Sequence, residues 1–306
     1  MKIRVIVLAA QGCTHAHAVV DSVSQQLMAG EELLIMEELA CGEAAVVELE
    51  SGARVAHISS EFKHDFDLAK SGMTNSGPSD LVPDLYVVFE DHAVPNERFM
   101  ESLREFFAND ERQGTTFYIR NGTPINPPSR ALYAYVCGLA DVESKREKIE
   151  PVTSSFAITS RALGGADVNA VKAVLSSMNF GWLQYTKVPE LMHDPINQPP
   201  KDLYVVHCQV NTFSQAVSAI FWNARSNAVI DAGSLSLVSA GLRMPIKYLG
   251  RSVQVMRARP QDLPTSCMIF ALGVCGYAGW WIGRFVGDSG AAEKIVATHP
   301  VPATKQ

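Results

Sequence analysis

The chain has 306 residues, of which 47% are apolar and 19% are charged, so it is long enough to bury a substantial core in one large domain or two smaller ones. Its net charge of −6 argues against a general nucleic-acid-binding protein, and we expect no nucleic-acid partner. The charged fraction lies below the roughly 25% that is usual for soluble domains, which indicates that part of the surface does not face bulk water.

The N-terminal part of the chain alternates short apolar runs with segments of helical periodicity. Residues 16–28 place valines and a leucine on one helical face, and a Ser51-Gly52 pair predicts a turn between two strands. This alternation predicts an α/β fold with a mostly parallel mixed sheet flanked by helices. The expected strands, in chain order, are residues 3–10, 32–36, 44–49, 54–58, 85–90, 115–119, 154–159 and 182–186, and further helices are expected over 98–109, 130–141 and 168–178.

The strand over 85–90 ends in three consecutive side chains that can bind metal, Glu90, Asp91 and His92, and Pro95 stops it shortly afterwards. Acids at the carboxyl end of a buried strand lie where open α/β sheets bind their ligands. Residues two apart on a strand project to one side, so Glu90 and His92 can reach one cation, with Asp91 as an alternative ligand. An imidazole ligand favours manganese over magnesium. An exposed turn is the simpler interpretation of the same residues.

This strand end resembles the metal-binding region of family-2 glycosyltransferases, which have a GT-A fold. Aligned on Pro95, Glu90 and His92 stand where the two aspartates of that family's D-x-D motif fall. The resemblance covers residues 1–195 by order of elements. It implies an inverting transfer of a sugar from a nucleotide diphosphate donor to a hydroxyl of a glycan or lipid-linked acceptor of the cell envelope, with Mn²⁺ or Mg²⁺ as cofactor.

The resemblance also implies roles for four other residues. Glu37 would contact the nucleotide, Lys70 would neutralise its diphosphate, and His193 would complete the metal or diphosphate site. The nearest acid to the position of the catalytic base is Asp167, a few residues out of register, so Asp91 and Asp167 are the acids expected to serve catalysis. Simpler roles remain open: a solvated helix start for Glu37, a surface lysine, a structural histidine, and a helix N-cap for Asp167.

The composition changes after the proline-rich segment 194–201, which predicts two domains, 1–195 and 196–306. Residues 203–287 hold seven bases and two acids, a net charge of +5, whereas the remainder carries −11. A cationic, apolar region of this kind suits an anionic membrane surface, with an acidic protein partner as the alternative.

A helix is predicted over 213–230, followed by an uncharged stretch over 266–283 that is near the lower limit for crossing a bilayer, about 20 residues. Within it, Gly273, Gly276, Gly279 and Gly283 fall on one helical face, which lets another helix approach closely. We expect this helix to lie in or dip into one leaflet, with a buried core helix as the alternative.

The six cysteines show no metal-finger spacing, and the N-terminal apolar run is too brief for a signal peptide. We therefore expect a reduced, cytoplasmic location, peripheral at the inner face of the membrane. A second hypothesis is a GT-A-like binding or scaffold protein that has lost catalysis, favoured by the missing base and the altered metal motif. Nucleotidyl transfer is less favoured, because residues 10–13 hold one glycine and no base.

Overall fold

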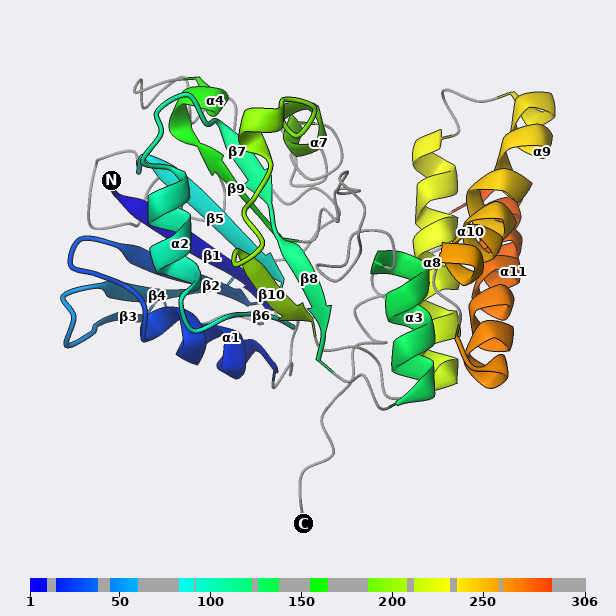
Figure 1. Ribbon diagram of the computed structural model, residues 1–306, viewed down its shortest axis with the longest axis horizontal. Coiled ribbons are helices and arrows are strands. Elements are labelled where there is room, and N and C mark those ends of the chain that lie inside the picture. Colours follow the sequence, from blue (N-terminus) through cyan, green and yellow to red (C-terminus); the bar gives the residue numbers. More distant parts are fainter. Residues whose placement is uncertain are drawn as a thin grey trace, which may run out of the picture. The chain divides into compact units, whose positions relative to one another are not determined.

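The structure, a computed structural model, describes residues 1–9, 15–37, 45–59, 83–90, 92–122, 126–137, 155–164, 187–207, 212–231, 236–258 and 261–287. The chain divides into two compact units (Figure 1). The first, called here the α/β unit, comprises residues 1–120 and 147–207. The second, the helical unit, comprises residues 121–146 and 208–306.

A seven-stranded mixed sheet forms the centre of the α/β unit, which confirms the predicted fold class. Its strand order is β3-β4-β2-β1-β5-β9-β7, in which β4, β2, β1 and β5 are parallel while β3 and β9 run antiparallel to their neighbours. The strands are β1 (Ile3–Ala9), β2 (Glu32–Glu37), β3 (Ala45–Glu48), β4 (Arg54–Ser59), β5 (Leu85–Glu90), β7 (Gly114–Thr116) and β9 (Phe156–Thr159).

The central strands β1 and β5 are apolar on both faces because the sheet is covered on both sides there. Val5 and Val87 on one face have no solvent exposure, and Ile6 and Val88 on the other face are 1% and 4% exposed. From β1 the chain adds β2 on one side and later returns to add β5 on the other. The carboxyl ends of β1 and β5 therefore lie at the point where the strand order reverses, which is where open α/β sheets bind ligands.

A second, three-stranded sheet has the order β6-β10-β8. The sequence predicted one strand over 115–119, but the chain splits there into β7 and β8, which belong to different sheets. The split falls at Phe117, whose ring is buried against Phe89 and Phe99 at centroid distances of 5.7 and 4.7 Å. The strands of this sheet are β6 (Ala93–Pro95), β8 (Tyr118–Asn121) and β10 (Tyr204–His207).

Two helices, α1 (His15–Ser24) and α2 (Phe99–Phe106), lie on one face of the main sheet (Figure 1). The Arg104 side chain on α2 joins that helix to the turn after α1 by a buried ion pair with Glu31, at 2.7 Å. Among its described residues, the α/β unit also has the short helices α4 (Ser160–Leu163) and α7 (Val188–Leu191) and the 3₁₀ turn η3 (Pro195–Asn197).

The helical unit is built around α11, and the predicted glycine face of this helix is its packing face. A Cβ on Gly279 would come within 2.4 Å of the Phe221 carbonyl, and one on Gly283 equally close to that of Arg225, so α8 and α11 approach backbone to backbone. The helices are α3 (Pro127–Cys137), α8 (Phe213–Asp231), α9 (Leu237–Pro245), the π-helix η4 (Ile246–Gly250), α10 (Arg251–Ala258) and α11 (Leu263–Val286).

Among the described residues, α11 is long and apolar enough to cross a membrane by length and composition, and 39% of its most apolar stretch is buried within the protein. The division of the chain also differs from the predicted boundary at residue 195. The strand β10, at 204–207, completes the small sheet of the α/β unit, whereas α3, at 127–137, packs with α8 and α11 in the helical unit.

Candidate metal centre

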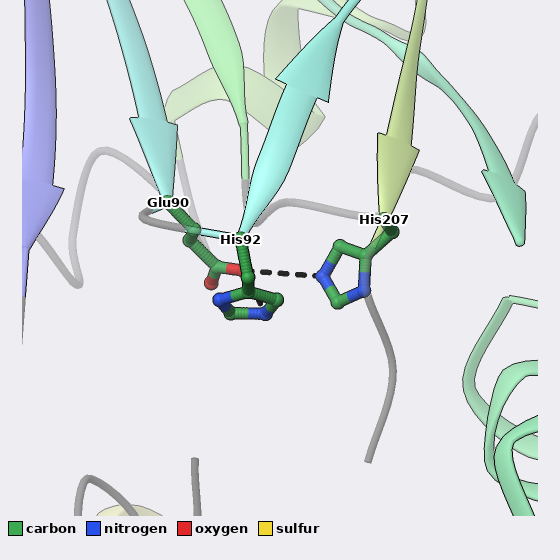
Figure 2. Close-up of side chains that lie close together, drawn as sticks. All are labelled: Glu90, His92 and His207. Carbon is green, nitrogen blue, oxygen red and sulfur yellow. Dashed lines mark hydrogen bonds and ion pairs between the residues drawn. The ribbon is translucent and has the colours of Figure 1, made fainter. Parts of the chain in front are cut away.

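Three side chains that can bind metal converge just beyond β5: Glu90, His92 and His207. The Nε2 atoms of His92 and His207 lie 3.3 and 3.4 Å from the same carboxylate oxygen, Oε2 of Glu90. The two rings meet edge to face, with centroids 4.2 Å apart. Figure 2 shows the carboxylate and both imidazoles turned toward one point, with each residue at the end or the start of a strand. All three are partly buried, the imidazoles with 13% of their surface exposed and the carboxylate with 28%.

The chain holds Glu90 in place through its neighbours. The preceding residue, Phe89, is fully buried between Phe99 and Phe117, so the end of β5 is anchored in the core. The backbone N–H of Glu90 donates a 3.4 Å hydrogen bond to Oγ of Ser155, a buried residue directly before β9. Because strand residues alternate between faces, anchoring Phe89 inward turns Glu90 the other way.

The two histidines come from paired strands of the small sheet. His92 precedes β6, and His207 is the last residue of β10, where it lies opposite Ala93 in the antiparallel register. His92 stands just before the regular ladder, and from there its ring meets that of His207 edge to face. Pro95 ends β6 and is tolerated because β6 is an edge strand of its sheet.

The donor set fits a divalent cation. Two ligand atoms that share one cation at about 2.1 Å lie roughly 3 to 3.5 Å apart, which matches the observed separations. The ligand atoms of all three residues lie within 4.8 Å of one another. One carboxylate and two imidazoles form a set that suits manganese, zinc or iron better than magnesium, whose usual ligands are oxygen atoms.

The cluster lies at the edge of the main sheet where the strand order reverses. Glu90 on β5 is in register with Leu8 on β1, and Ala9 on β1 is in register with Glu37 on β2. The backbones of Glu37 and Glu90 are therefore two strands apart at one edge, about 10 Å from each other at the usual strand spacing. The structure thus brings three of the predicted site residues, Glu37, Glu90 and His92, to the same edge.

The other predicted residues fall into two groups. Asp91, Lys70 and Asp167 lie outside the described residues, and their roles remain predictions. His193 is exposed, in the turn that follows α7.

The turn that carries His193 packs against the opposite end of the sheet from Glu90. Leu191 lies against Gly114, and Asn197 accepts a hydrogen bond from the Gln113 N–H. Gly114 is paired with Ile158, which is in turn paired with Tyr86 near the start of β5. The structure therefore does not bring His193 to the metal centre.

His207 was missed by the sequence analysis, although a signal for it exists. The residues before it, Leu203-Tyr-Val-Val, repeat the Leu85-Tyr-Val-Val that begins β5. An apolar β-rich run that ends in a polar, metal-binding side chain is the same pattern that drew attention to Glu90. Applied to 203–207, it predicts a strand that ends in a ligand, beyond the proline-rich segment that was interpreted as a boundary.

No protein-family model matches the chain, and no curated protein sequence matches it. Similar solved structures include the glucosyl-3-phosphoglycerate synthase of Mycobacterium tuberculosis in complex with Mn²⁺, uridine diphosphate and phosphoglyceric acid. It is 16% identical with a TM-score of 0.31, over 57% of this chain and 62% of that one, so this chain spans less than two thirds of its length.

Two further structures are similar over most of this chain. The mannosyltransferase of Pyrobaculum calidifontis, in complex with GDP-Man and Mn²⁺, is 9% identical with a TM-score of 0.39, over 99% of this chain and 76% of that one. S. aureus TarS 1–349 is 8% identical with a TM-score of 0.37, over 98% and 89% of the two chains. At these identities and TM-scores, the likeness is confined to the general course of the chain.

Proposed function

We propose that this protein is a family-2-type glycosyltransferase, which moves a sugar from a nucleotide diphosphate donor to a hydroxyl acceptor with inversion and with the help of a divalent cation. The observation that carries the proposal is the convergence of Glu90, His92 and His207 at the sheet edge where the strand order reverses. Support also comes from the position of Glu90 and His92 relative to Pro95, which matches the metal-binding motif of that family.

In this proposal Glu90, His92 and His207 hold the cation, and Asp91 is the fourth ligand. A cation bound there neutralises the negative charge that builds on the leaving diphosphate, where electrostatic stabilisation has its largest effect. Glu37 contacts the nucleotide, because its backbone lies at the same edge about 10 Å from Glu90 at the usual strand spacing. Lys70 adds positive charge beside the diphosphate.

The remaining step is removal of the acceptor proton. We assign it to Asp167, the nearest acid to the position at which the family has its base. The acceptor belongs to a lipid-linked or cell-envelope glycan, so the protein works at the cytoplasmic face of the membrane. The cationic C-terminal third supports that location, because it is attracted to anionic lipid.

Calorimetric titration of the full chain with UDP and with GDP tests the proposal, each in the presence of MnCl₂, MgCl₂ or EDTA. We expect one nucleotide to bind with manganese, more weakly with magnesium, and not with EDTA. Glu90→Gln and His207→Ala should each abolish binding. His193→Ala is the matched control, an exposed histidine of the same unit that lies at the other end of the sheet, and it should leave binding unchanged. A wild-type protein that binds neither nucleotide under any of these conditions contradicts the proposal.

A second candidate is a nucleotide-binding or scaffold protein without turnover. The replacement of two aspartates by Glu90 and His92 favours it, because an imidazole contributes no negative charge to the site. Release of nucleotide diphosphate from a panel of nucleotide sugars distinguishes the two functions. An enzyme releases it in proportion to protein, and the release disappears in Asp167→Asn, whereas a scaffold binds nucleotide and releases none.

A further inference from the structure

The helix α9 is apolar on two opposite sides. Its buried stripe consists of Ala240 and Met244, four residues apart, and continues to Tyr248 on η4. Another stripe, shifted by two residues and therefore turned by about 200°, consists of Val238, Leu242 and Ile246. These three are 78%, 72% and 74% exposed. A helix that packs one apolar face and exposes another presents a surface that is suited to a partner.

A second exposed apolar group lies at the carboxyl end of α11. Phe285 and Val286 are 69% and 66% exposed, and the Phe285 ring stacks on Trp281 at 5.6 Å. Ala240 and Met244 of α9 belong to the same buried cluster as Trp280, against which Trp281 also packs. The segments that carry the two exposed groups therefore share one buried cluster. The exposed apolar residues around this cluster are called the apolar end here: Leu237, Val238, Leu242, Ile246, Phe285 and Val286.

The charged residues of the segments that carry the apolar end have a single sign. Residues 237–258 contain four bases and no acid, and 263–286 contain one base and no acid. Arg243 follows Leu242, Lys247 follows Ile246, and Arg284 precedes Phe285, so bases lie beside the exposed apolar residues. Apolar residues flanked by cations are typical of segments that lie at the surface of an anionic bilayer.

We propose that the apolar end docks on an anionic lipid surface, with its apolar side chains among the lipid headgroups and Arg243, Lys247 and Arg284 against the phosphates. A second copy of the same surface is a poorer occupant, because a two-fold interface would bring the cations of one copy close to those of the other, and like charges repel. The proposal does not depend on the glycosyltransferase assignment, since every residue it uses lies in the helical unit.

The same packing argues against α11 as a membrane-spanning helix. Eight residues along one face of α11 are buried in the helical unit, including all four glycines. Its partner α8 carries Arg225, which is 7% exposed and donates a 2.7 Å hydrogen bond from Nε to the Gly287 carbonyl. A spanning α11 would have to leave this packing with α8. Docking through the apolar end leaves the helical unit intact.

Co-sedimentation of the full chain with vesicles tests the proposal. The vesicles contain phosphatidylcholine alone or phosphatidylcholine and phosphatidylglycerol in equal parts. We expect wild-type protein to bind the anionic vesicles and to be released in part by high salt. Leu242→Glu combined with Ile246→Glu should weaken binding at least about tenfold, because two inserted side chains become charged. The matched control is Phe270→Glu combined with Val274→Glu, two exposed apolar residues of α11 away from the apolar end, and it should bind within about twofold of wild type.

Three results would overturn the proposal. The first is a wild-type protein that does not bind the anionic vesicles, and the second is equal loss in both double variants, which would indicate contact along the length of α11. The third result combines two observations. Light scattering shows that the wild-type protein is a dimer and that the Leu242→Glu with Ile246→Glu variant is a monomer, while both bind vesicles equally. Arg243→Ser with Lys247→Ser serves as an independent variant if the first does not fold. It should weaken binding to the anionic vesicles, and unchanged binding would count against the proposal.

Discussion

The two units of this protein bury their polar groups by different means. The α/β unit pairs charged side chains inside its core: Arg4 with Glu32 across neighbouring strands at 2.6 Å, and Arg104 with Glu31 at 2.7 Å. The helical unit relies on small residues that let helix backbones touch, and it satisfies its buried Arg225 with a backbone carbonyl. The α/β unit thus buries these charges as matched pairs, whereas the helical unit brings helix backbones into close contact.

Among the described residues, each unit also has a group that differs from these pairs and contacts, and both groups are candidate functional surfaces. In the α/β unit the acid at the end of β5 lies beside two imidazoles. In the helical unit an apolar face of α9 is exposed in place of being packed. A residue pattern that breaks with the rest of its own unit is thus a better guide to function here than any single motif.

The largest effect is expected from breaking a buried ion pair of the α/β unit. Arg104→Met should lower the free energy of unfolding by about 3 kcal/mol, because it leaves the buried Glu31 carboxylate without its cation. Chemical denaturation measures this. The control is Arg98→Ala, which removes the exposed ion pair with Glu101 on the same helix and should leave the denaturation midpoint unchanged. If both variants lowered the free energy of unfolding equally, the buried ion pair would contribute no more to stability than the exposed one.

A smaller effect is expected from enlarging a glycine of the helical unit. Gly279→Ala should lower the free energy of unfolding by about 2 kcal/mol, since the new Cβ clashes with backbone atoms of Phe221, which cannot move away by a change of rotamer. Gly241→Ala on α9 is the control, because nothing lies within 4 Å of the new methyl group. There the better helix propensity of alanine should raise stability by up to about 1 kcal/mol. Circular dichroism during urea denaturation measures both changes in the free energy of unfolding. If the two changes had the same sign, the packing described above would be contradicted.

Metal binding should stabilise the α/β unit by a lesser amount. Free Mn²⁺ at about ten times its dissociation constant adds about 1.4 kcal/mol to the folded state, and EDTA removes that increment. Differential scanning calorimetry should show a higher midpoint with manganese in wild type and in His193→Ala, and no shift in His207→Ala. A shift that persists in His207→Ala would place the cation elsewhere.

The smallest effect concerns the N-terminus of α11. The Asp262 carboxylate caps this helix, and a hydrogen bond from the Thr265 backbone N–H, followed by its side chain and by Arg130, lowers the pKa of Asp262. A lowered pKa means stabilisation that is present above the ordinary value of 3.8 and is lost as the pH falls through the folded value. Thermal denaturation measured as a function of pH should therefore show that the difference in midpoint temperature between wild type and Asp262→Ala becomes smaller below pH 3.8. A difference that stays constant down to the lowest accessible pH would contradict the role of Asp262 as the cap.

The sequence predicted most of the sheet because buried strands can be identified as apolar runs, as at residues 3–9 and 85–90. It also predicted that Glu90 and His92 lie close together, but from alternation along one strand, whereas β5 ends at Glu90 and His92 precedes β6 of the other sheet. The division of 115–119 into two strands was not predictable, because it depends on the packing of Phe117 with residues that are distant in sequence.

The third member of the metal centre was not predicted for a related reason. A ligand set assembled from two sheets depends on which strands pair, and the pairing of β6 with β10 joins segments more than a hundred residues apart. The sequence analysis therefore favoured His193, the histidine expected from the resemblance, over His207. The glycine face of α11 was predictable because its spacing is local to one helix.

The position of His207 bears on how the protein is made. It lies 117 residues after Glu90, at the far end of the segments that build the α/β unit. During synthesis the chain emerges from its N-terminus, so Glu90 and His92 leave the ribosome long before their partner does. The ligand set is complete only when β10 has joined the small sheet. A cation that binds at that moment would link β5 and the start of β6, which are synthesised early, to β10, which is synthesised late. Cation capture would then report that translation has passed the last strand of this unit.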